Sequence, residues 1–363
     1  MKDAFYKFLN NSISRHFLTP RYLILFVSNQ CWMKCGHCWF SEEWKKDNLK
    51  DDSLSFDELE RLSDSVNKLL FLSITGGEAF GRDDIPEVVN LFTRDGKTQR
   101  YQIPTSGYLT SKIISNTEKI LSQNPGIPFR VDVSLDGNME IHDKIRNLKG
   151  CFSNALETIK ELNKIKKKIP YFDVGVITTI SNQNQEIVEE ISDIVNSVHP
   201  DGEWMVNLVR GNTRDPESGK VKLENYNKAQ DIINKRIKDG TFKGHSGHLS
   251  AKWLTAKNSV RRKVINDIVL DKKEGGACSA GSIAGVIYAD GSVYPCEMLD
   301  ISFGNLRDFD FNLSELWNTR EAVELRNRIQ DTRCICTQEC FLSTSLLIQP
   351  QLWPQLIYER LRH

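Results

Sequence analysis

The chain has no excess of charge of either sign, and it lacks long apolar runs. Lys and Arg number 48, as do Asp and Glu, so the formal net charge is +0. A neutral composition provides no general attraction for nucleic acid or for an anionic bilayer. The longest early apolar run, Tyr22 to Val27, is too short to span a membrane, and residues 1–20 show no signal peptide. We therefore expect a cytoplasmic protein with neither a nucleic-acid nor a membrane partner.

Cysteine is absent from most of the chain but grouped where it occurs. The 363 residues contain nine cysteines, an odd number. A grouped, odd set fits metal binding in a reducing compartment better than a disulfide framework. One cysteine stands apart: Cys151 follows Gly150 at an expected helix start. We expect it to be a buried structural thiol.

Three cysteines, Cys31, Cys35 and Cys38, lie within eight residues directly after a strand-like run at 21–28. Structural zinc sites use four protein ligands, and 4Fe-4S clusters usually use four thiolates. Three close cysteines therefore predict a cluster with one iron left open for a reactive ligand. A zinc site that borrows a histidine such as His37, or three unrelated thiols, is the alternative.

The C-x3-C-x2-C spacing resembles the cluster-binding loop of the radical S-adenosylmethionine (radical SAM) enzymes. The resemblance implies that the open iron binds S-adenosylmethionine, and that one electron cleaves it to methionine and a 5′-deoxyadenosyl radical. It also implies an electron donor of flavodoxin or ferredoxin type. Members of the family usually carry an aromatic residue before the third cysteine, where this chain has His37. Its imidazole can also stack on adenine, and Trp39 is a second candidate for that role.

Later segments match other motifs of the family at the ends of strand-like runs. An apolar run at 69–75 ends in Gly76-Gly77-Glu78, and glycine lets the backbone approach a ligand closely. The resemblance implies that Glu78 or nearby backbone carbonyls accept hydrogen bonds from the methionine ammonium group. Ligands of α/β sheets lie at such strand ends. The cofactor-binding residues implied in this way are His37, Gly76, Gly77, Glu78, Ser106, Ser134, Asp136 and Arg146.

Some of these assignments have a plain structural alternative. Asp136-Gly137 could be only a turn, and Arg146 could lie on a solvent-exposed helix start. Ser106 also replaces the Asn of the family's Thr-Asn-Gly segment.

Strand-like and helical runs alternate between residues 21 and 210. Helices are expected at 56–70, 85–94, 111–122, 151–168 and 183–198, and further strands at 101–107, 129–137, 171–180 and 203–210. Such alternation predicts βα units around a mainly parallel sheet. The six strands agree with the α/β fold of the family, a partial (β/α)6 barrel whose chemistry lies at the C-terminal strand ends.

A second cysteine group follows residue 275. Cys278 and Cys296 flank two short strand-like runs around an Asp-Gly turn, so a hairpin would bring them together. A helical run then leads to Cys334, Cys336 and Cys340. This region resembles the auxiliary-cluster domain called SPASM or, when shortened, twitch.

The number of cysteines limits what this second region can bind. The full SPASM pattern carries enough cysteines for two clusters, whereas five are present here. We therefore expect one auxiliary 4Fe-4S cluster, held by Cys278, Cys296 and Cys340, with Cys336 favoured over Cys334 as the fourth ligand. A tetrahedral zinc site is the alternative, because a cysteine-only site does not identify its metal.

The chain is expected to divide into four segments: a radical SAM barrel at 1–210, with its core at about 20–210, a helical connection at 211–275, a hairpin-plus-helix auxiliary-cluster domain at 276–345 and a C-terminal tail at 346–363. The connection should help to cover the barrel mouth and contact substrate. Metal binding by its His245 and His248 is not expected.

The resemblances imply a radical SAM enzyme that abstracts hydrogen from a substrate. Our leading hypothesis is modification of a ribosomally synthesised peptide, and the alternative is dehydrogenation or rearrangement of a small metabolite or sugar. A non-enzymatic zinc-binding interaction protein is a third hypothesis, from a different class. Only about twenty residues precede the first strand, so we expect no leader-peptide-binding module there. A separate partner protein could supply that function.

Overall fold

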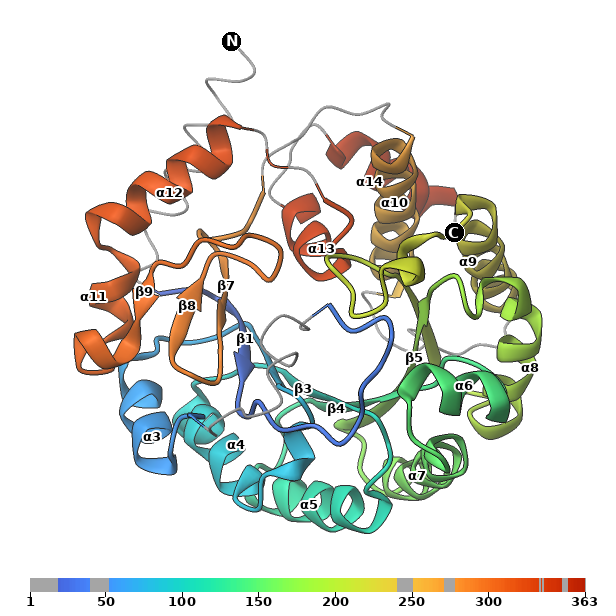
Figure 1. Cartoon of the computed structure of the whole chain (residues 1–363), viewed down its shortest axis with the longest axis horizontal. Coiled ribbons are helices and arrows are strands. Elements are labelled where there is room, and N and C mark those ends of the chain that lie inside the picture. Colours follow the sequence, from blue (N-terminus) through green and yellow to red (C-terminus); the bar gives the residue numbers. More distant parts are fainter. Residues whose placement is uncertain are drawn as a thin grey trace.

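The computed structural model describes residues 19–39, 52–239, 251–270, 278–332, 334, 336–347 and 352–362. A nine-stranded sheet in the order β6-β5-β4-β3-β2-β1-β7-β8-β9 forms its centre. The sheet curves into a partial barrel with helices around its outside (Figure 1). This confirms the expected α/β fold class.

Six parallel strands form the larger part of the barrel, and each is hydrogen-bonded to the next in the chain. They are β1 (Tyr22–Phe26), β2 (Phe71–Thr75), β3 (Tyr101–Thr105), β4 (Phe129–Ser134), β5 (Phe172–Ile180) and β6 (Glu203–Leu208). The surrounding helices are α3 (Phe56–Ser65), α4 (Ile85–Thr93), α5 (Thr110–Gln123), α6 (Met139–Arg146), α7 (Cys151–Lys166) and α8 (Val188–Val198). The alternation predicted from the sequence is therefore present.

Helix α3 is shorter than the 56–70 expected from the sequence. It begins at a capping box, in which Ser55 and Glu58 each hydrogen-bond to the other's backbone N–H. It ends where Val66 becomes extended, and the Leu69 N–H then donates to Lys97 O at 2.6 Å. The residues after 65 are thus used to lead into β2.

Strand β4 shows how the barrel wall divides its side chains. Phe129, Val131 and Val133 belong to the main apolar core, whereas Ser134 on the other face lines a cavity. Arg130 is buried on that inner face and pairs with Asp132 at 2.5 Å. Space for this pair comes from Gly175, where a Cβ would lie 2.0 Å from Arg130 Nη2.

The C-terminal hairpin extends the barrel sheet. Strand β7 (Ala284–Ile287) pairs in parallel with β1 and antiparallel with β8 (Ser292–Tyr294), which pairs with β9 (Gly304–Asn305). Gly291 forms the turn between β7 and β8 with φ 86°, a left-handed conformation that favours glycine. The hairpin is followed by α11 (Leu313–Trp317), α12 (Arg320–Asp331) and α13 (Glu339–Leu347).

Helix α13 lies at the open side of the partial barrel, between the β7 hairpin and α10 (Figure 1). Its Glu339 carboxylate accepts a hydrogen bond of 2.9 Å from the N–H of Leu208 at the end of β6. On the opposite side the ring of Phe341 lies 6.3 Å from that of Tyr22 on β1. Helix α13 therefore links the two sides of the opening.

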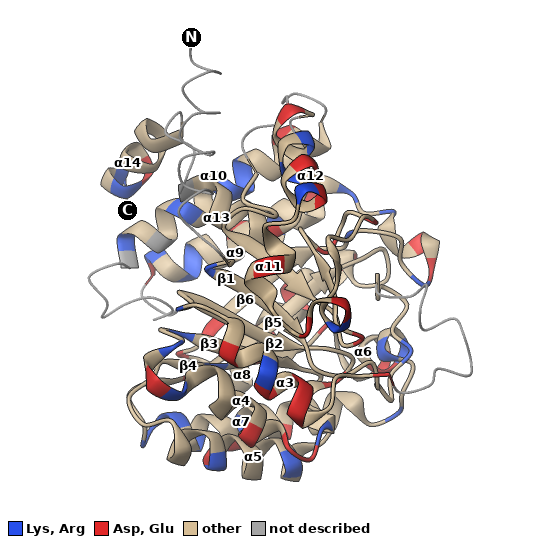
Figure 2. Cartoon of the chain, turned by 90° about the vertical axis from the view of Figure 1, so that its left-hand side faces the viewer, with Lys and Arg blue, Asp and Glu red and all other residues tan. Residues whose placement is uncertain are grey.

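The remaining helices are α9 (Leu223–Lys238), α10 (Ala251–Val269) and α14 (Trp353–Arg362). Leu346 and Leu356 pack with Val260 and Val264, so the segment expected as a tail includes a helix packed on α10. His245 and His248 lie outside the described residues. Across the described ranges no helix combines the length and apolarity needed to cross a membrane. Lys or Arg and Asp or Glu are interspersed on outer helices such as α12 (Figure 2).

Candidate active site

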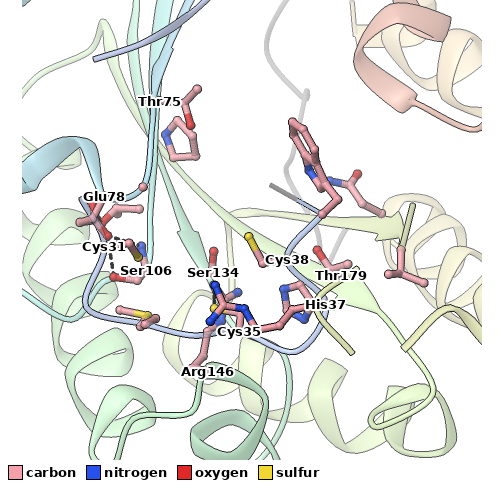
Figure 3. Close-up of a pocket in the computed structure, with 18 of the residues that line it drawn as sticks. Cys31, Cys35, His37, Cys38, Thr75, Glu78, Ser106, Ser134, Arg146 and Thr179 are labelled. Carbon is pink, nitrogen blue, oxygen red and sulfur yellow. Dashed lines mark hydrogen bonds between the residues drawn. The ribbon is translucent and has the colours of Figure 1, made fainter. Parts of the chain in front are cut away.

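A cavity of about 260 Å³ opens at the C-terminal ends of the barrel strands. It is lined by the cysteine loop and by residues that end β2, β3, β4 and β6 (Figure 3). Most of the residues that the sequence predicts to bind the cofactor line this cavity: His37, Gly76, Gly77, Glu78, Ser106, Ser134 and Arg146. Asp136 lies behind this wall, paired with Arg146. The structure thus brings the whole predicted set together.

Backbone hydrogen bonds fix the cysteine loop against the glycine turn that follows β2. The N–H of Gly77 donates to Ser28 O, and that of Glu78 to Gln30 O, each at 2.9 Å. Gly76 has φ 154°, and a Cβ there would lie 2.5 Å from Ser28 O. Only glycine permits this close approach, which places the turn beside the start of the cysteine loop.

The thiols of Cys31, Cys35 and Cys38 all face this cavity. They pack in one cluster with Met33 and with Cys151, which is fully buried, as expected for a structural thiol. Burial raises the pKa of Cys31 to about 12 and also raises that of Cys35. In the part of the chain that the structure describes, no three Cys, His, Asp or Glu side chains form a ready single-ion site. The donor set, three thiols on one loop, is the set that a cluster with three cysteine ligands requires.

Glu78 connects the ends of β2 and β3. Its side chain is buried, and it accepts hydrogen bonds from Thr105 Oγ1 at 2.8 Å, from Ser106 N at 2.9 Å and from Ser106 Oγ at 2.6 Å. Both carboxylate oxygens therefore have protein donors. Ser106 contributes to the cavity by holding Glu78, a contact that the sequence did not reveal.

Arg146 is buried at the end of α6, so the alternative of a solvent-exposed helix start is wrong. Its Nε donates to Asp136 Oδ2 at 2.8 Å, and its Nη1 lies 3.9 Å from Cys35 Sγ. Asp136 Oδ1 accepts from Thr179 N at 2.9 Å, so Asp136 is more than a turn residue. Burial opposes ionisation of Asp136, but the Arg146 guanidinium outweighs it and keeps the pKa of the carboxyl below its usual range.

His37 lies in the cavity wall, with its Nδ1 atom buried and unpaired among the described residues. Burial lowers the pKa of this histidine to about 4, so the ring is neutral near pH 7. Trp39, the second candidate for stacking on adenine, lines the same cavity. A neutral imidazole and an indole on one wall suit contact with a flat heterocycle.

Several cavity residues were not anticipated from the sequence. They come from the ends of β5 and β6 and from the segment after β6: Thr179, Asn207, Arg210 and Arg214. Arg210 lies 3.5 Å from Glu339 and 3.6 Å from Glu297. The available signal was their position at the ends of expected strands, where ligands of parallel sheets bind.

The second cysteine group converges from three segments of the chain. Burial, and after it the neighbouring thiols Cys336, Cys296 and Cys334, raise the pKa of Cys278 to about 12. After burial, Cys336 and Cys334 also raise the pKa of Cys296. Cys340 packs in one apolar cluster with Cys278 and Cys296, and its side chain hydrogen-bonds with Tyr22. The structure thus places Cys340 beside Cys278 and Cys296, and it brings Cys334 and Cys336 close enough to interact electrostatically with both.

Family models match both halves of this arrangement. The model for the radical SAM superfamily matches residues 25–195, and the model for the SPASM iron-sulfur cluster-binding domain matches residues 278–341. The chain belongs to the radical SAM superfamily. It is a radical SAM enzyme with a C-terminal SPASM domain, and its cofactors are S-adenosylmethionine, a 4Fe-4S cluster and an auxiliary iron-sulfur cluster.

Two relatives cover most of this radical SAM protein. Fe-coproporphyrin III synthase of Methanosarcina barkeri is 28% identical over 308 residues, 80% of this chain and 72% of the relative. The antilisterial bacteriocin subtilosin biosynthesis protein AlbA of Bacillus subtilis is 25% identical over 337 residues, 84% of this chain and 66% of AlbA. One relative is thus named as a coproporphyrin synthase and the other for bacteriocin biosynthesis, so the two names do not describe the same activity.

Solved structures share the same fold. One is histidine-tagged anSMEcpe with bound AdoMet, with a TM-score of 0.63 and 17% identity, covering 95% of this chain and 96% of that one. Another is Streptococcus suis SuiB bound to precursor peptide SuiA, with a TM-score of 0.61 and 16% identity, covering 87% of this chain and 69% of SuiB. At this identity the similarity establishes the fold alone.

Proposed function

We propose that this radical SAM enzyme modifies a ribosomally synthesised peptide. The observation that carries the proposal is that the cavity at the strand ends is open and not enclosed. Sites for small molecules usually enclose most of the ligand, roughly 70–90% of its surface. An open cavity suits a peptide, because most of the peptide can stay outside while only the reacting side chain enters.

Two of the similar proteins point the same way. AlbA is named for bacteriocin biosynthesis, and SuiB is described bound to a precursor peptide. These relationships are distant, so they support the substrate class and no particular bond. An electron donor of flavodoxin or ferredoxin type, and a separate protein that binds a leader peptide, are further parts of the proposal.

We assign the first cluster to Cys31, Cys35 and Cys38, within a barrel formed by residues 1–210. When bound, the cluster and S-adenosylmethionine supply one-electron cleavage to a 5′-deoxyadenosyl radical. Gly76 and Gly77 give the cofactor access to backbone carbonyls, while Glu78 and Ser106 hold the ends of β2 and β3 in position. Asp136 fixes Arg146 beside Cys35, and Ser134 lines the same wall. His37 contributes a neutral ring for adenine.

We assign the auxiliary cluster to the segment 276–345, after a helical connection at 211–275. Cys278, Cys296, Cys334 and Cys336 are its proposed ligands, because these thiols lie near one another. Cys340 packs beside Cys278 and Cys296, and we assign it to Tyr22, with which its side chain hydrogen-bonds. This changes the ligand preference based on the sequence, which favoured Cys340.

The test is a reaction with anaerobically reconstituted enzyme, dithionite, S-adenosylmethionine and a candidate precursor peptide encoded beside the gene. We expect 5′-deoxyadenosine and a mass change in the peptide. Deuterium at the reacting position should appear in 5′-deoxyadenosine. Formation of 5′-deoxyadenosine with no change in any encoded neighbouring peptide, together with turnover of a small metabolite, would contradict the peptide proposal.

A small-molecule substrate is the second candidate. The relative named Fe-coproporphyrin III synthase covers 80% of this chain and favours it. The same assay distinguishes the two when it is repeated with a deuterated candidate metabolite. Deuterium would then appear in 5′-deoxyadenosine with the metabolite and not with the labelled peptide.

A further inference from the structure

Among the residues that the structure describes, three arginines line the active-site cavity, and they differ in whether a carboxylate pairs with them. Arg146 is paired with the buried Asp136, and Arg210 lies within 3.6 Å of Glu297 and 3.5 Å of Glu339. Arg214 lines the same cavity, yet no carboxylate among the described residues pairs with it. Its Nε is buried and has no hydrogen-bond partner there. Of these three arginines, Arg214 is therefore the one whose positive charge has no carboxylate partner in the described part of the protein.

The backbone holds Arg214 beside the third cysteine. Its N–H donates to Cys38 O at 2.9 Å, and the N–H of Asp215 donates to Gly36 O at 2.8 Å. Burial raises the pKa of Cys35, and Arg146 and, to a smaller extent, Arg214 oppose that effect. The guanidinium thus lies near the cluster loop, on a segment whose main chain is fixed independently of its side chain.

The Nε of Arg214 is buried without a partner, so a ligand atom that accepts a hydrogen bond from it would offset the cost of its desolvation. The planar set of N–H donors of a guanidinium matches a carboxylate, to which it can donate two parallel hydrogen bonds. We propose that Arg214 binds a carboxylate group of a ligand in the active-site cavity. The inference rests on the proposed function, because it assumes that substrate reaches this cavity.

Two molecules could supply that carboxylate: the substrate, or S-adenosylmethionine through its methionine part. The family resemblance assigns the methionine ammonium group to the turn at Glu78. In Figure 3, Glu78 and Cys31 lie on one side of the cavity, and His37, Cys38 and Thr179 on the other. Arg214 is bonded to Cys38 and so belongs to this second side. The substrate is the favoured source: in a peptide, an acidic side chain or the C-terminus.

The first arm of the test compares matched acid and amide ligands. Holoenzyme saturated with S-adenosylmethionine is titrated calorimetrically with acetyl-Gly-Asp-Gly-amide and acetyl-Gly-Asn-Gly-amide, and with the corresponding Glu and Gln peptides. Wild type should prefer the acid of one pair by roughly 10- to 100-fold, the usual range for a hydrogen bond to a charged group. Arg214→Gln should abolish the preference, and Arg214→Lys should restore part of it. Arg320→Gln, on the exposed face of α12, is the matched surface control.

The second arm identifies the source. Binding of S-adenosylmethionine is compared with that of decarboxylated S-adenosylmethionine, in wild type and in Arg214→Gln of equal iron content. If the substitution weakens only the carboxylated cofactor, the carboxylate is that of the cofactor. If it alters only the peptide pairs, the carboxylate belongs to the substrate. Either result supports a carboxylate-binding Arg214.

Absence of an Arg214 effect in both arms would overturn the inference. A change only in the reduction potential of the first cluster, read by electron paramagnetic resonance, would also overturn it and make Arg214 a charge-balancing residue. The proposed function is judged separately, by the labelled precursor peptide and wild-type enzyme. A modified peptide with no Arg214 effect removes this inference alone, whereas an unmodified peptide counts against the proposed function.

Discussion

The two cysteine groups of this enzyme are assembled in opposite ways. Cys31, Cys35 and Cys38 lie on one short loop after β1, fixed by backbone bonds to the turn at Gly77. The second group joins a hairpin to residues that follow α12, more than thirty positions later. The first arrangement follows from local spacing, and the second requires the surrounding fold. Loss of barrel structure should therefore damage the second group more than the first.

Strand β1 connects the two groups physically. Its C-terminal end leads into the cysteine loop, and its edge pairs with β7 of the hairpin between Tyr22 and Leu25. Tyr22, at the start of β1, hydrogen-bonds with Cys340. The SPASM hairpin is thus a continuation of the barrel sheet, which provides a rigid connection between the two sites.

The largest expected effect separates the two groups completely. Replacement of Cys31, Cys35 and Cys38 together by Ala should remove about four irons per chain. It should also eliminate reductive cleavage of S-adenosylmethionine, because no open iron remains. Iron analysis and 5′-deoxyadenosine formation under anaerobic conditions measure both. Retained 5′-deoxyadenosine formation would show that this loop is not the cleavage site.

The next effect is expected at the second group alone. Cys278→Ala with Cys296→Ala should halve the iron, from about eight to about four atoms per chain. Basal cleavage of S-adenosylmethionine should survive, while turnover of the true substrate is lost. Stoichiometric zinc with only about four irons in freshly prepared wild-type enzyme would refute the two-cluster assignment. Product formation by the double variant would make the second site structural.

The same contrast explains what the sequence could predict. The first site depends on spacing within one loop and on strand-end residues, so the sequence could predict that Glu78, Ser106 and Arg146 lie at one cavity. Arg210 and Glu339 were missed because their pairing joins the end of β6 to α13 across the open side of the barrel. The pairing of β7 with β1 is also a long-range contact that a hairpin pattern does not encode.

A smaller change sharpens the ligand assignment within the second group. Cys336→Ala should lower the auxiliary iron, because Cys336 lies with Cys278 and Cys296. Cys340→Ala is the matched variant in the same short segment, and it should retain that iron, since Cys340 bonds with Tyr22. Iron content and the absorbance of each variant give the comparison. Equal losses in both would return Cys340 to the ligand set, as the sequence suggested.

At the first site, Glu78→Gln should weaken binding of S-adenosylmethionine without changing iron content. The carboxylate accepts hydrogen bonds from Thr105 and Ser106 on its two oxygens, whereas the amide of Gln has only one acceptor oxygen. The binding free energy of S-adenosylmethionine should become less favourable by roughly 1.5–3 kcal/mol in Glu78→Gln, which loses charge-assisted hydrogen bonds, and by about 0.5–1.5 kcal/mol in Ser106→Ala. Calorimetric titration with the cofactor measures both variants. Normal binding by Glu78→Gln would assign cofactor recognition to the backbone carbonyls alone.

The smallest effect tests the contact that joins the barrel to the second group. Tyr22→Phe removes the hydroxyl that bonds with Cys340 but keeps the ring, whose centroid lies 4.8 Å from that of Phe71. The free energy of unfolding of the anaerobic holoenzyme should fall by about 0.5–1.5 kcal/mol, the usual contribution of one hydrogen bond. Iron content should stay unchanged at both groups, because Cys340 is not assigned as a ligand. Chemical denaturation monitored by circular dichroism measures the free energy of unfolding, and iron analysis measures the iron content. If the auxiliary iron decreases as well, the Tyr22–Cys340 pair is part of the cluster site, and Cys340 is not separate from the other four thiols of the second group.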